Sequence, residues 1–179
     1  MSSITKVHVK KDISDQYDLL ITGVQDGQNK FSINKNLTDL SNQSIQSVLK
    51  GEKKFATDKK RVVIYNNGPI KKIALYGYIK ENDTDKIRSL ASDIVSYSNL
   101  NKVSSIAIDA RSFAITSKNL QAFVEGLMIG SYQFLNYKPK SKGNTLADVT
   151  LIGSVDQKIV SKGAVIGLGA CYGRDLSNH

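Results

Sequence analysis

Hydrophobic and polar residues along this chain follow two different periods. Where they alternate with a period of two, the pattern favours a β-strand, because successive side chains of a strand point to opposite faces of a sheet. Short, nearly continuous apolar runs favour strands that are buried on both faces. Together these patterns predict strands at residues 4–10, 17–24, 61–65, 71–79, 103–110 and 148–153.

Between these runs the apolar residues recur every three or four positions, which is typical of helices that bury one face. Helices are expected over the second half of residues 37–51, from residue 118 to about 136, and from 156 to about 176. A further helix is expected after Asp83 or Thr84, and Thr116 or Ser117 is expected to cap the helix at 118. The helix after Asp83 has apolar residues at i, i+3, i+4, i+7 and i+8, namely Ile87, Leu90, Ala91, Ile94 and Val95.

Turn residues separate several of these elements. Residues 26–30 and 138–144 are polar and are interpreted as loops. The run Asn66 to Pro69 predicts a hairpin between two strands, because Asn-Gly favours a tight turn. A hairpin implies antiparallel strands, whereas the alternation of strands and helices after residue 61 favours parallel ones. The predicted fold is therefore α/β, with a mixed sheet flanked by helices on both sides.

One helical stretch raises a question of its own. EGLMIGSYQFLNYK, residues 125–138, has helical spacing, yet Gly126 and Gly130 lie four residues apart within it. A glycine inside a helix costs about 1 kcal/mol relative to alanine. Since both glycines fall on one face, we interpret that face as a place where a neighbouring backbone approaches closely. Glu125 lies at or beyond the edge of the apolar stripe, so it is expected to be solvated or to make an interface contact.

Composition is that of a folded domain. Hydrophobic residues make up 40% of the 179 positions and charged residues 23%, which is close to globular averages. This length suits one domain, or one domain and the beginning of another. The single cysteine, Cys171, excludes an internal disulfide, and the first residues lack the apolar run of a secretory signal. We therefore expect a cytoplasmic protein with no membrane partner.

Basic residues are in excess, with 25 Lys and Arg against 16 Asp and Glu, for a formal net charge of +9. Much of this excess lies in residues 50–80, which contain nine basic residues and two acidic ones. Such a segment can attract nucleic acid by neutralising phosphates. The alternative, which the abundance of Asn and Ser favours, is a lysine-rich surface that keeps loops and strand ends solvated.

Few residues point to catalysis or metal binding. His8 lies on an expected strand and His179 is the last residue, and neither has another His or a Cys four positions away. The sequence contains neither a zinc motif nor a phosphate-binding loop. Cys171 has no histidine near it in sequence except His179, so we expect a buried structural thiol rather than a nucleophile. The sequence thus predicts no catalytic residue and no metal ligand in this chain.

Two further candidates also have a structural interpretation. Asp109 follows an apolar strand, at the position where α/β proteins place binding residues, but with Arg111 it can equally form a local ion pair. GLGACYG, residues 167–173, differs from a dinucleotide-binding motif by one residue of spacing. We interpret it as a set of small residues that lets a helix pack closely.

The stretch that contains Gly126 and Gly130 resembles a helix in the N-terminal, non-catalytic domain of the leucyl (cytosol) aminopeptidase family. The family pattern there is like E-G-x-x-L/I-G-x-Y-x-F-x-x-Y-K. The matching residues are Glu125, Gly126, Ile129, Gly130, Tyr132, Phe134, Tyr137 and Lys138. The last residues, GAVIGLGACYGRDLSNH, resemble the linker helix of the family. Four of them match its entry to the catalytic domain: Arg174, Asp175, Leu176 and Asn178.

This resemblance implies a macro-domain-like three-layer sandwich over residues 1–155 and a linker helix over residues 156–179 that leads to a C-terminal catalytic domain. In the family that second domain holds two divalent metals, Mn or Zn, in motifs such as N-T-D-A-E-G-R. This chain lacks the motif, and GNTLAD at residues 143–148 shares letters with it but not the spacing of the acids. The resemblance is weak before residue 60.

The resemblance therefore implies an accessory domain that ends where the catalytic domain begins, either as a piece of a longer protein or as a natural truncation. Its partners would be its own catalytic domain and the other subunits of a homo-hexamer, and its role would be structural. Two alternatives stay open. One is a nonspecific nucleic-acid-binding module that uses residues 50–80, and the other is a macro-type pocket for an ADP-ribose-like ligand.

Overall fold

Apolar runs form strands and amphipathic runs form helices in the computed structural model of the chain. It describes residues 4, 6–13, 15–26, 39–66, 70–80, 82–133 and 143–178. The strands are β1 (Lys6–Lys10), β2 (Leu19–Val24), β3 (Arg61–Tyr65), β4 (Lys72–Gly77), β5 (Ser105–Asp109) and β6 (Asp148–Ile152). The helices are α1 (Asp39–Gly51), α2 (Thr84–Leu100), α3 (Ser117–Gly130) and α4 (Gln157–Ser177).

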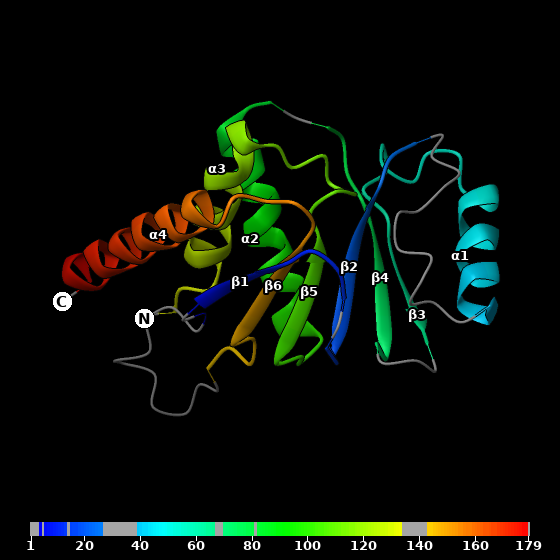
Figure 1. Cartoon of the computed structure of the whole chain (residues 1–179), viewed down its shortest axis with the longest axis horizontal. Helices are drawn as coiled ribbons and strands as arrows, with labels where there is room; N and C mark the ends of the chain where they lie inside the picture. The colour runs from blue at the N-terminus through cyan, green and yellow to red at the C-terminus, as the bar shows by residue number, and fades with distance from the viewer. Residues whose placement is uncertain are drawn as a thin grey trace.

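The strands form one six-stranded sheet in the order β1-β6-β5-β2-β4-β3. Neighbours are parallel from β1 to β4, whereas β3 at the edge pairs antiparallel with β4. Figure 1 shows this order, with β1 and β3 at opposite edges of the sheet. The antiparallel pair agrees with the predicted hairpin, although residues 67–69 lie outside the described part, as does most of the predicted turn at 26–30.

Two hydrophobic clusters lie on the two faces of the sheet. Alternation along β2 sends Leu19 and Ile21 toward α2 and α3, and sends Leu20 and Val24 toward α1. In the register, Leu20 lies beside Ile73 of β4 and Ala107 of β5, and all three belong to the cluster on the α1 face. Figure 1 shows α1 on one side of the sheet and α2 and α3 on the other. This arrangement confirms the predicted α/β fold, a mixed sheet with helices on both faces.

Helix α2 begins and packs as its sequence predicts. The Asp83 carboxylate accepts hydrogen bonds from the backbone amides of Asp85, at 2.8 Å, and Lys86, so Asp83 is the N-cap. Ile87, Ala91, Ile94 and Val95 are buried. Leu90 is only half-buried, because it lies at the mouth of a cavity described below.

Helix α3 ends at Gly130, about six residues before the predicted end. The Ser131 hydroxyl donates to the Met128 carbonyl at 2.8 Å, which caps the last turn. The carbonyl of Ser131 accepts instead from the Asn144 side chain at 2.9 Å, so the chain that returns toward β6 takes the place of a further helical turn. Phe134, Tyr137 and Lys138 lie outside the described residues, and of the predicted loop at 138–144 only Gly143 and Asn144 are described.

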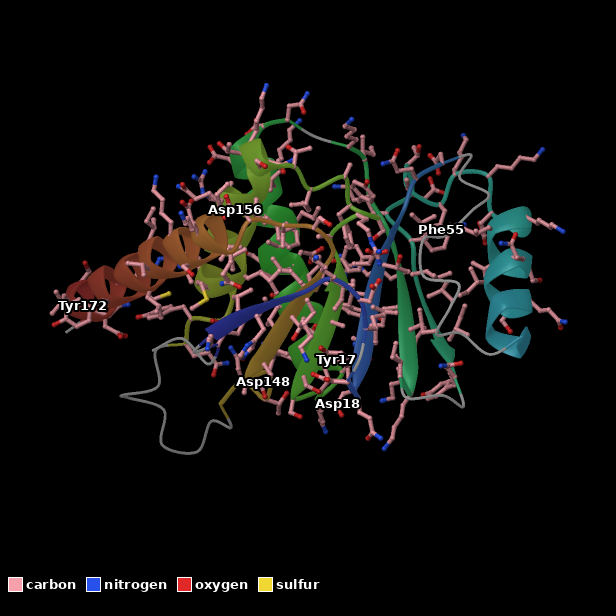
Figure 2. All side chains as sticks on the ribbon, in the orientation of Figure 1. Tyr17, Asp18, Phe55, Asp148, Asp156 and Tyr172 are labelled. Carbon is pink, nitrogen blue, oxygen red and sulfur yellow. The ribbon has the colours of Figure 1, made fainter. Side chains whose placement is uncertain are left out.

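Helix α4 spans residues 157–177, close to the predicted range. It packs against α3 and β1 and then extends away from the sheet toward the C-terminus (Figure 1). In Figure 2, Asp156 marks its beginning and Tyr172 lies near its far end. Asp156 caps the helix by accepting from the Lys158 amide at 2.8 Å.

Candidate functional site

The residues singled out by the sequence lie mainly where α2, α3 and α4 meet. Gly126 and Gly130 of α3 face α2, as their spacing predicts. A Cβ atom on Gly126 would lie 2.7 Å from the Cα of Arg88, and one on Gly130 would lie 2.6 Å from the Cα of Ser92. Real Cβ atoms do not approach other atoms this closely, so both positions require glycine. The Ser92 hydroxyl also donates to the Gly126 carbonyl at 2.9 Å, which fixes the crossing.

Glu125 is not solvated; of the two options expected from its place on the helix, it makes an interface contact, which here joins α3 to α2. The residue is 4% exposed. The Arg88 guanidinium of α2 donates to one carboxylate oxygen at 2.7 Å, and the Gln121 amide donates to the other at 2.7 Å. The hydrogen bond from Arg88 to Glu125 raises the pKa of the guanidinium above its ordinary value. Because Arg88 also pairs with Asp85, Glu125 is part of an ion-pair network that ties α3 to the start of α2.

The opposite side of α3 receives glycines from α4. A Cβ on Gly163 would lie 2.9 Å from the Gln121 carbonyl oxygen, and one on Gly167 would lie 2.5 Å from the Cβ of Met128. Cys171 lies one turn further along, buried, with its sulfur 3.5 Å from the Met128 carbonyl oxygen. Burial raises the pKa of this thiol, as expected for a structural cysteine.

Only some of the small residues in GLGACYG, residues 167–173, therefore pack against α3. Gly167 approaches α3 closely, whereas a Cβ on Gly169 or Gly173 would meet nothing within 4 Å.

The end of α4 is held to the end of α3 by polar contacts. The Tyr132 hydroxyl donates to the Asp175 carboxylate at 3.0 Å and accepts from the Asn178 amide at 3.2 Å. Arg174 lies over the Tyr132 ring, 5.9 Å from its centroid.

Helix α4 has a second apolar face, which is exposed. Its buried residues are Val160, Gly163, Gly167 and Cys171. Its large exposed apolar residues include Val165, Leu168, Tyr172 and Leu176, which we name the α4 stripe. Each residue of the stripe lies five positions after one of these buried residues. Five positions correspond to a rotation of about 140° around the helix axis. Since α3 covers the buried row, it does not cover the stripe as well, and Val165 is 68% exposed.

A cavity of about 500 Å³ lies at the carboxyl end of β4. It is bordered by the end of β4, the first half of α2, the start of β3, and the loop between β5 and α3. Arg61 and Asp93 pair beside it, and the Tyr76 hydroxyl donates to the Asp93 carboxylate at 2.5 Å. Burial and this hydrogen bond raise the pKa of Tyr76 far above its usual value. No feature of the sequence singled out this cavity, because its walls come from four separate segments.

Asp109 forms the local ion pair that was one of its two interpretations. Its buried carboxylate accepts from the Arg111 guanidinium at 2.9 Å, and Arg111 also lies 3.8 Å from Asp12. In the basic segment, Lys60 pairs with Glu52 and lies 3.9 Å from Asp58. Part of the positive charge of residues 50–80 is thus neutralised locally.

Within the described residues, no three His, Cys, Asp or Glu side chains gather so that they could hold a metal ion. None of the described helices combines the length and the hydropathy that crossing a membrane requires. No pattern in the sequence singled out Arg88, whose role appears only in the structure. The available signal was its position on α2, one residue after Ile87 and at the edge of the buried face.

Comparisons with solved structures show which fold this is. A mutant of tomato leucine aminopeptidase matches with a TM-score of 0.65 and 19% identity, over 97% of this chain and 38% of that one. The bottromycin maturation enzyme BotP matches in a complex with Mn, with a TM-score of 0.62 and 17% identity over 91% of this chain and 32% of that one. A second structure of BotP matches with a TM-score of 0.61 and 18% identity, over 91% of this chain and 33% of that one. The chain thus spans about a third of the length of these proteins.

A search of curated protein sequences gave no match. The family model for the N-terminal domain of the cytosol aminopeptidase family matches residues 21–141, well over half of the chain. The match concerns the N-terminal domain alone, and it favours neither the nucleic-acid-binding nor the ADP-ribose alternative. The chain belongs to the cytosol aminopeptidase family, in which it corresponds to the N-terminal domain.

Proposed function

We propose that this chain is the accessory and assembly domain of a cytoplasmic, metal-dependent leucyl aminopeptidase. The catalytic domain of that enzyme would follow α4 and remove N-terminal residues from peptides. The family assignment supports the domain's identity. The observation that carries its role is the α4 stripe, an apolar helix face at the end of the chain that no described residue covers.

The division of the chain follows from this proposal. Residues 1–155 form the accessory domain, and residues 156–179 form the linker helix. The N-cap at Asp156 supports this boundary, since α4 starts there as a separate rod. Tyr132, Asp175 and Asn178 then fix the direction in which the linker leaves the domain, through the two hydrogen bonds described above.

The metals belong to the catalytic domain in this proposal. The described residues offer no cluster of donor side chains, so we assign the two divalent ions, Mn or Zn, to side chains outside them. The solved complex of BotP with Mn supports manganese as one candidate. This chain on its own is accordingly proposed to have no peptidase activity.

An activity comparison tests the proposal. The purified 179-residue chain and the full product of its gene are incubated with leucine p-nitroanilide and Mn²⁺ or Zn²⁺. We expect turnover from the full product and none from the chain. Metal-dependent turnover that follows the chain through several chromatographic steps, or a gene that encodes no further domain, would overturn the proposal.

Assembly is tested in the same pair of proteins. We propose that the full protein is a homo-hexamer and that the chain alone is a monomer or a weak oligomer. The tightest subunit contacts would need the catalytic domain, and the exposed α4 stripe by itself allows only loose association. Light scattering over a range of concentrations measures both. A stable hexamer of the chain alone at low micromolar concentration would contradict this expectation, because it would show that the domain assembles without the catalytic domain.

A further inference from the structure

The cavity at the carboxyl end of β4 has the volume of a small-molecule site. Its volume of about 500 Å³ falls within the range of roughly 300–1,000 Å³ that is usual for ligand pockets. It lies where a parallel strand ends, the position at which α/β proteins bind ligands. None of its lining residues belongs to the α4 stripe, so an inference about it does not depend on the proposed function.

Aromatic rings close the floor of the cavity. Tyr76, Tyr78 and Phe113 line it, but they are at most 5% exposed. The Phe113 ring lies 6.2 Å from the Tyr76 ring and 5.0 Å from the Tyr78 ring. The Arg61 guanidinium covers Tyr76, 4.6 Å from the centroid of its ring. Since the rings are already covered by one another and by Arg61, a ligand meets the other lining residues instead.

The accessible apolar residues of the cavity are aliphatic and come from three segments. Ile79, which follows β4, is 55% exposed. Leu90 of α2 and Ile115, before α3, are half-buried and line the same cavity. Leu90 belongs to the apolar face of α2, on which Ile87 and Ala91 are buried, so the chain leaves a core-type side chain partly uncovered. Together the three side chains present hydrocarbon surface that a ligand can bury.

Asp93 offers a polar contact beside this aliphatic surface. Its Oδ2 atom accepts from the Arg61 guanidinium and from the Tyr76 hydroxyl, whereas its Oδ1 atom accepts from no described residue. The side chain is 47% exposed. Because Arg61 already balances its charge, Oδ1 suits an uncharged donor, such as a hydroxyl or an amide, better than a further cation. Lys59 and Lys86 border the cavity as exposed side chains, whose charges solvent and salt screen.

The backbone that borders the cavity is fixed by its own hydrogen bonds. Lys59 and Ala114 adopt positive φ angles of 49° and 50°, which are unfavourable for residues other than glycine. The amide of Lys60 donates to the Phe55 carbonyl at 2.9 Å, and the amide of Ile115 donates to the Ala110 carbonyl at 3.1 Å. The cavity is thus formed before any ligand enters.

We propose that this cavity binds an uncharged aliphatic molecule that carries one hydrogen-bond donor. Its hydrocarbon chain packs against Ile79, Leu90 and Ile115, and its hydroxyl or amide group donates to Oδ1 of Asp93. A diphosphate fits less well, because its charge would lie beside Asp93 and because the Asp83 carboxylate already accepts from the amides at the start of α2.

A titration of the 179-residue chain with 1-hexanol, followed by the NMR signals of its labelled methyl groups, tests the proposal. We expect saturable shifts at Ile79, Leu90 and Ile115 with a Kd of about 1–5 mM. Since each buried methylene contributes about fourfold, 1-butanol should bind at least about fivefold more weakly. Butyl ethyl ether, an isomer of 1-hexanol without a donor, should bind at least about threefold more weakly.

Three outcomes would overturn the proposal. The first is the absence of a saturable shift at these three residues up to about 20 mM 1-hexanol. The second is equal affinity for 1-hexanol and the ether, because Asp93 would then receive no hydrogen bond. The third is a set of shifts confined to Val165 and Leu176, which would place the alcohol on the α4 stripe.

Two pairs of variants locate the site. Ile79→Ser should weaken 1-hexanol binding at least about threefold, whereas Val165→Ser, also an exposed aliphatic residue but away from the cavity, should not. Ser89→Trp fills the opening and should abolish binding. Its matched control, Ser96→Trp, changes an exposed serine further along α2 that does not line the cavity. Unchanged binding in a folded Ser89→Trp variant would contradict the proposed site.

Discussion

Helices α3 and α4 contain glycines at the same spacing but lie in different environments. In α3, Gly126 and Gly130 contact α2, and the opposite side receives α4, so the helix is covered from two directions. In α4, Gly163 and Gly167 contact α3, but the face about 140° away is exposed. Small residues thus set how closely two helices approach, whereas the number of neighbours decides whether a helix is buried.

The largest expected effect comes from enlarging a glycine at the α2–α3 crossing. In Gly126→Leu the new side chain meets the backbone of Arg88, which cannot move aside as a side chain can. We expect a loss of at least about 3 kcal/mol in the free energy of unfolding, measured by urea denaturation.

Gly169→Leu is the matched control, because a Cβ there meets nothing within 4 Å. It should leave stability unchanged or raise it by up to about 1 kcal/mol, since leucine favours helix more than glycine does. If Gly126→Leu does not fold, Gly126→Ala provides the milder change. Equal stability of the α3 and α4 variants would contradict the difference between the two helices.

The same leucine truncation should have different effects in the two helices. Leu127 of α3 is completely buried, so Leu127→Ala is expected to cost about 2–5 kcal/mol. Leu176 of α4 is 61% exposed, so Leu176→Ala should cost less than about 0.5 kcal/mol in this chain. Thermal unfolding followed by circular dichroism measures both. In a longer protein the second value should rise if the proposed catalytic domain covers the α4 stripe.

Polar contacts should show a smaller contrast. Glu125→Gln removes the charge that balances Arg88 inside the α2–α3 contact, and we expect a loss of about 2 kcal/mol. Asp175→Asn changes a half-buried contact to Tyr132 at the end of α4 and should cost about 0–1 kcal/mol. Chemical denaturation of both variants at low and high salt distinguishes the two contributions, because salt screens the more exposed charge of Asp175 more strongly. A larger effect at Asp175 than at Glu125 would be inconsistent with their burial.

The smallest expected effect on stability concerns Cys171. The reactivity of its thiol shows whether α4 remains packed on α3. Burial raises the pKa of its thiol, so folding favours the protonated form. Its stabilising contribution is complete below the unfolded pKa of about 8.5 and is lost as the pH rises through that value and above it. Labelling by a disulfide reagent at pH 8 should be at least about tenfold slower than for an unfolded peptide thiol and should accelerate as the pH rises.

Two glycine variants check this explanation of the labelling rate. Gly167→Leu should push α4 away from Met128 and accelerate labelling, whereas Gly169→Leu should not. Labelling of the unaltered chain at the rate of a free thiol would show that α4 does not stay on α3.

Local sequence predicted much of the fold. The period of the apolar residues located all six strands and all four described helices, and Asp83 was one of two residues expected to cap α2 because of their hydrogen-bonding chemistry. The glycine spacing in α3 predicted a close approach, which α2 provides. These features depend on residues within a few positions of one another.

Other features depend on residues that are far apart in the chain. Helix α3 ends at Gly130 because Asn144 bonds the next carbonyl, and Glu125 is buried because Arg88, 37 residues earlier, supplies a charge partner. The cavity at β4 likewise requires four segments to meet.

The sequence by itself therefore determined the elements, their caps and the small residues that permit close helix packing, because backbone geometry and side-chain period are local properties. Only the tertiary structure decided which faces of those helices are covered, since burial and charge pairing depend on what the rest of the chain brings near. Helices α3 and α4 show this plainly, because the same glycine spacing lies in one helix that is enclosed and in another that is half exposed.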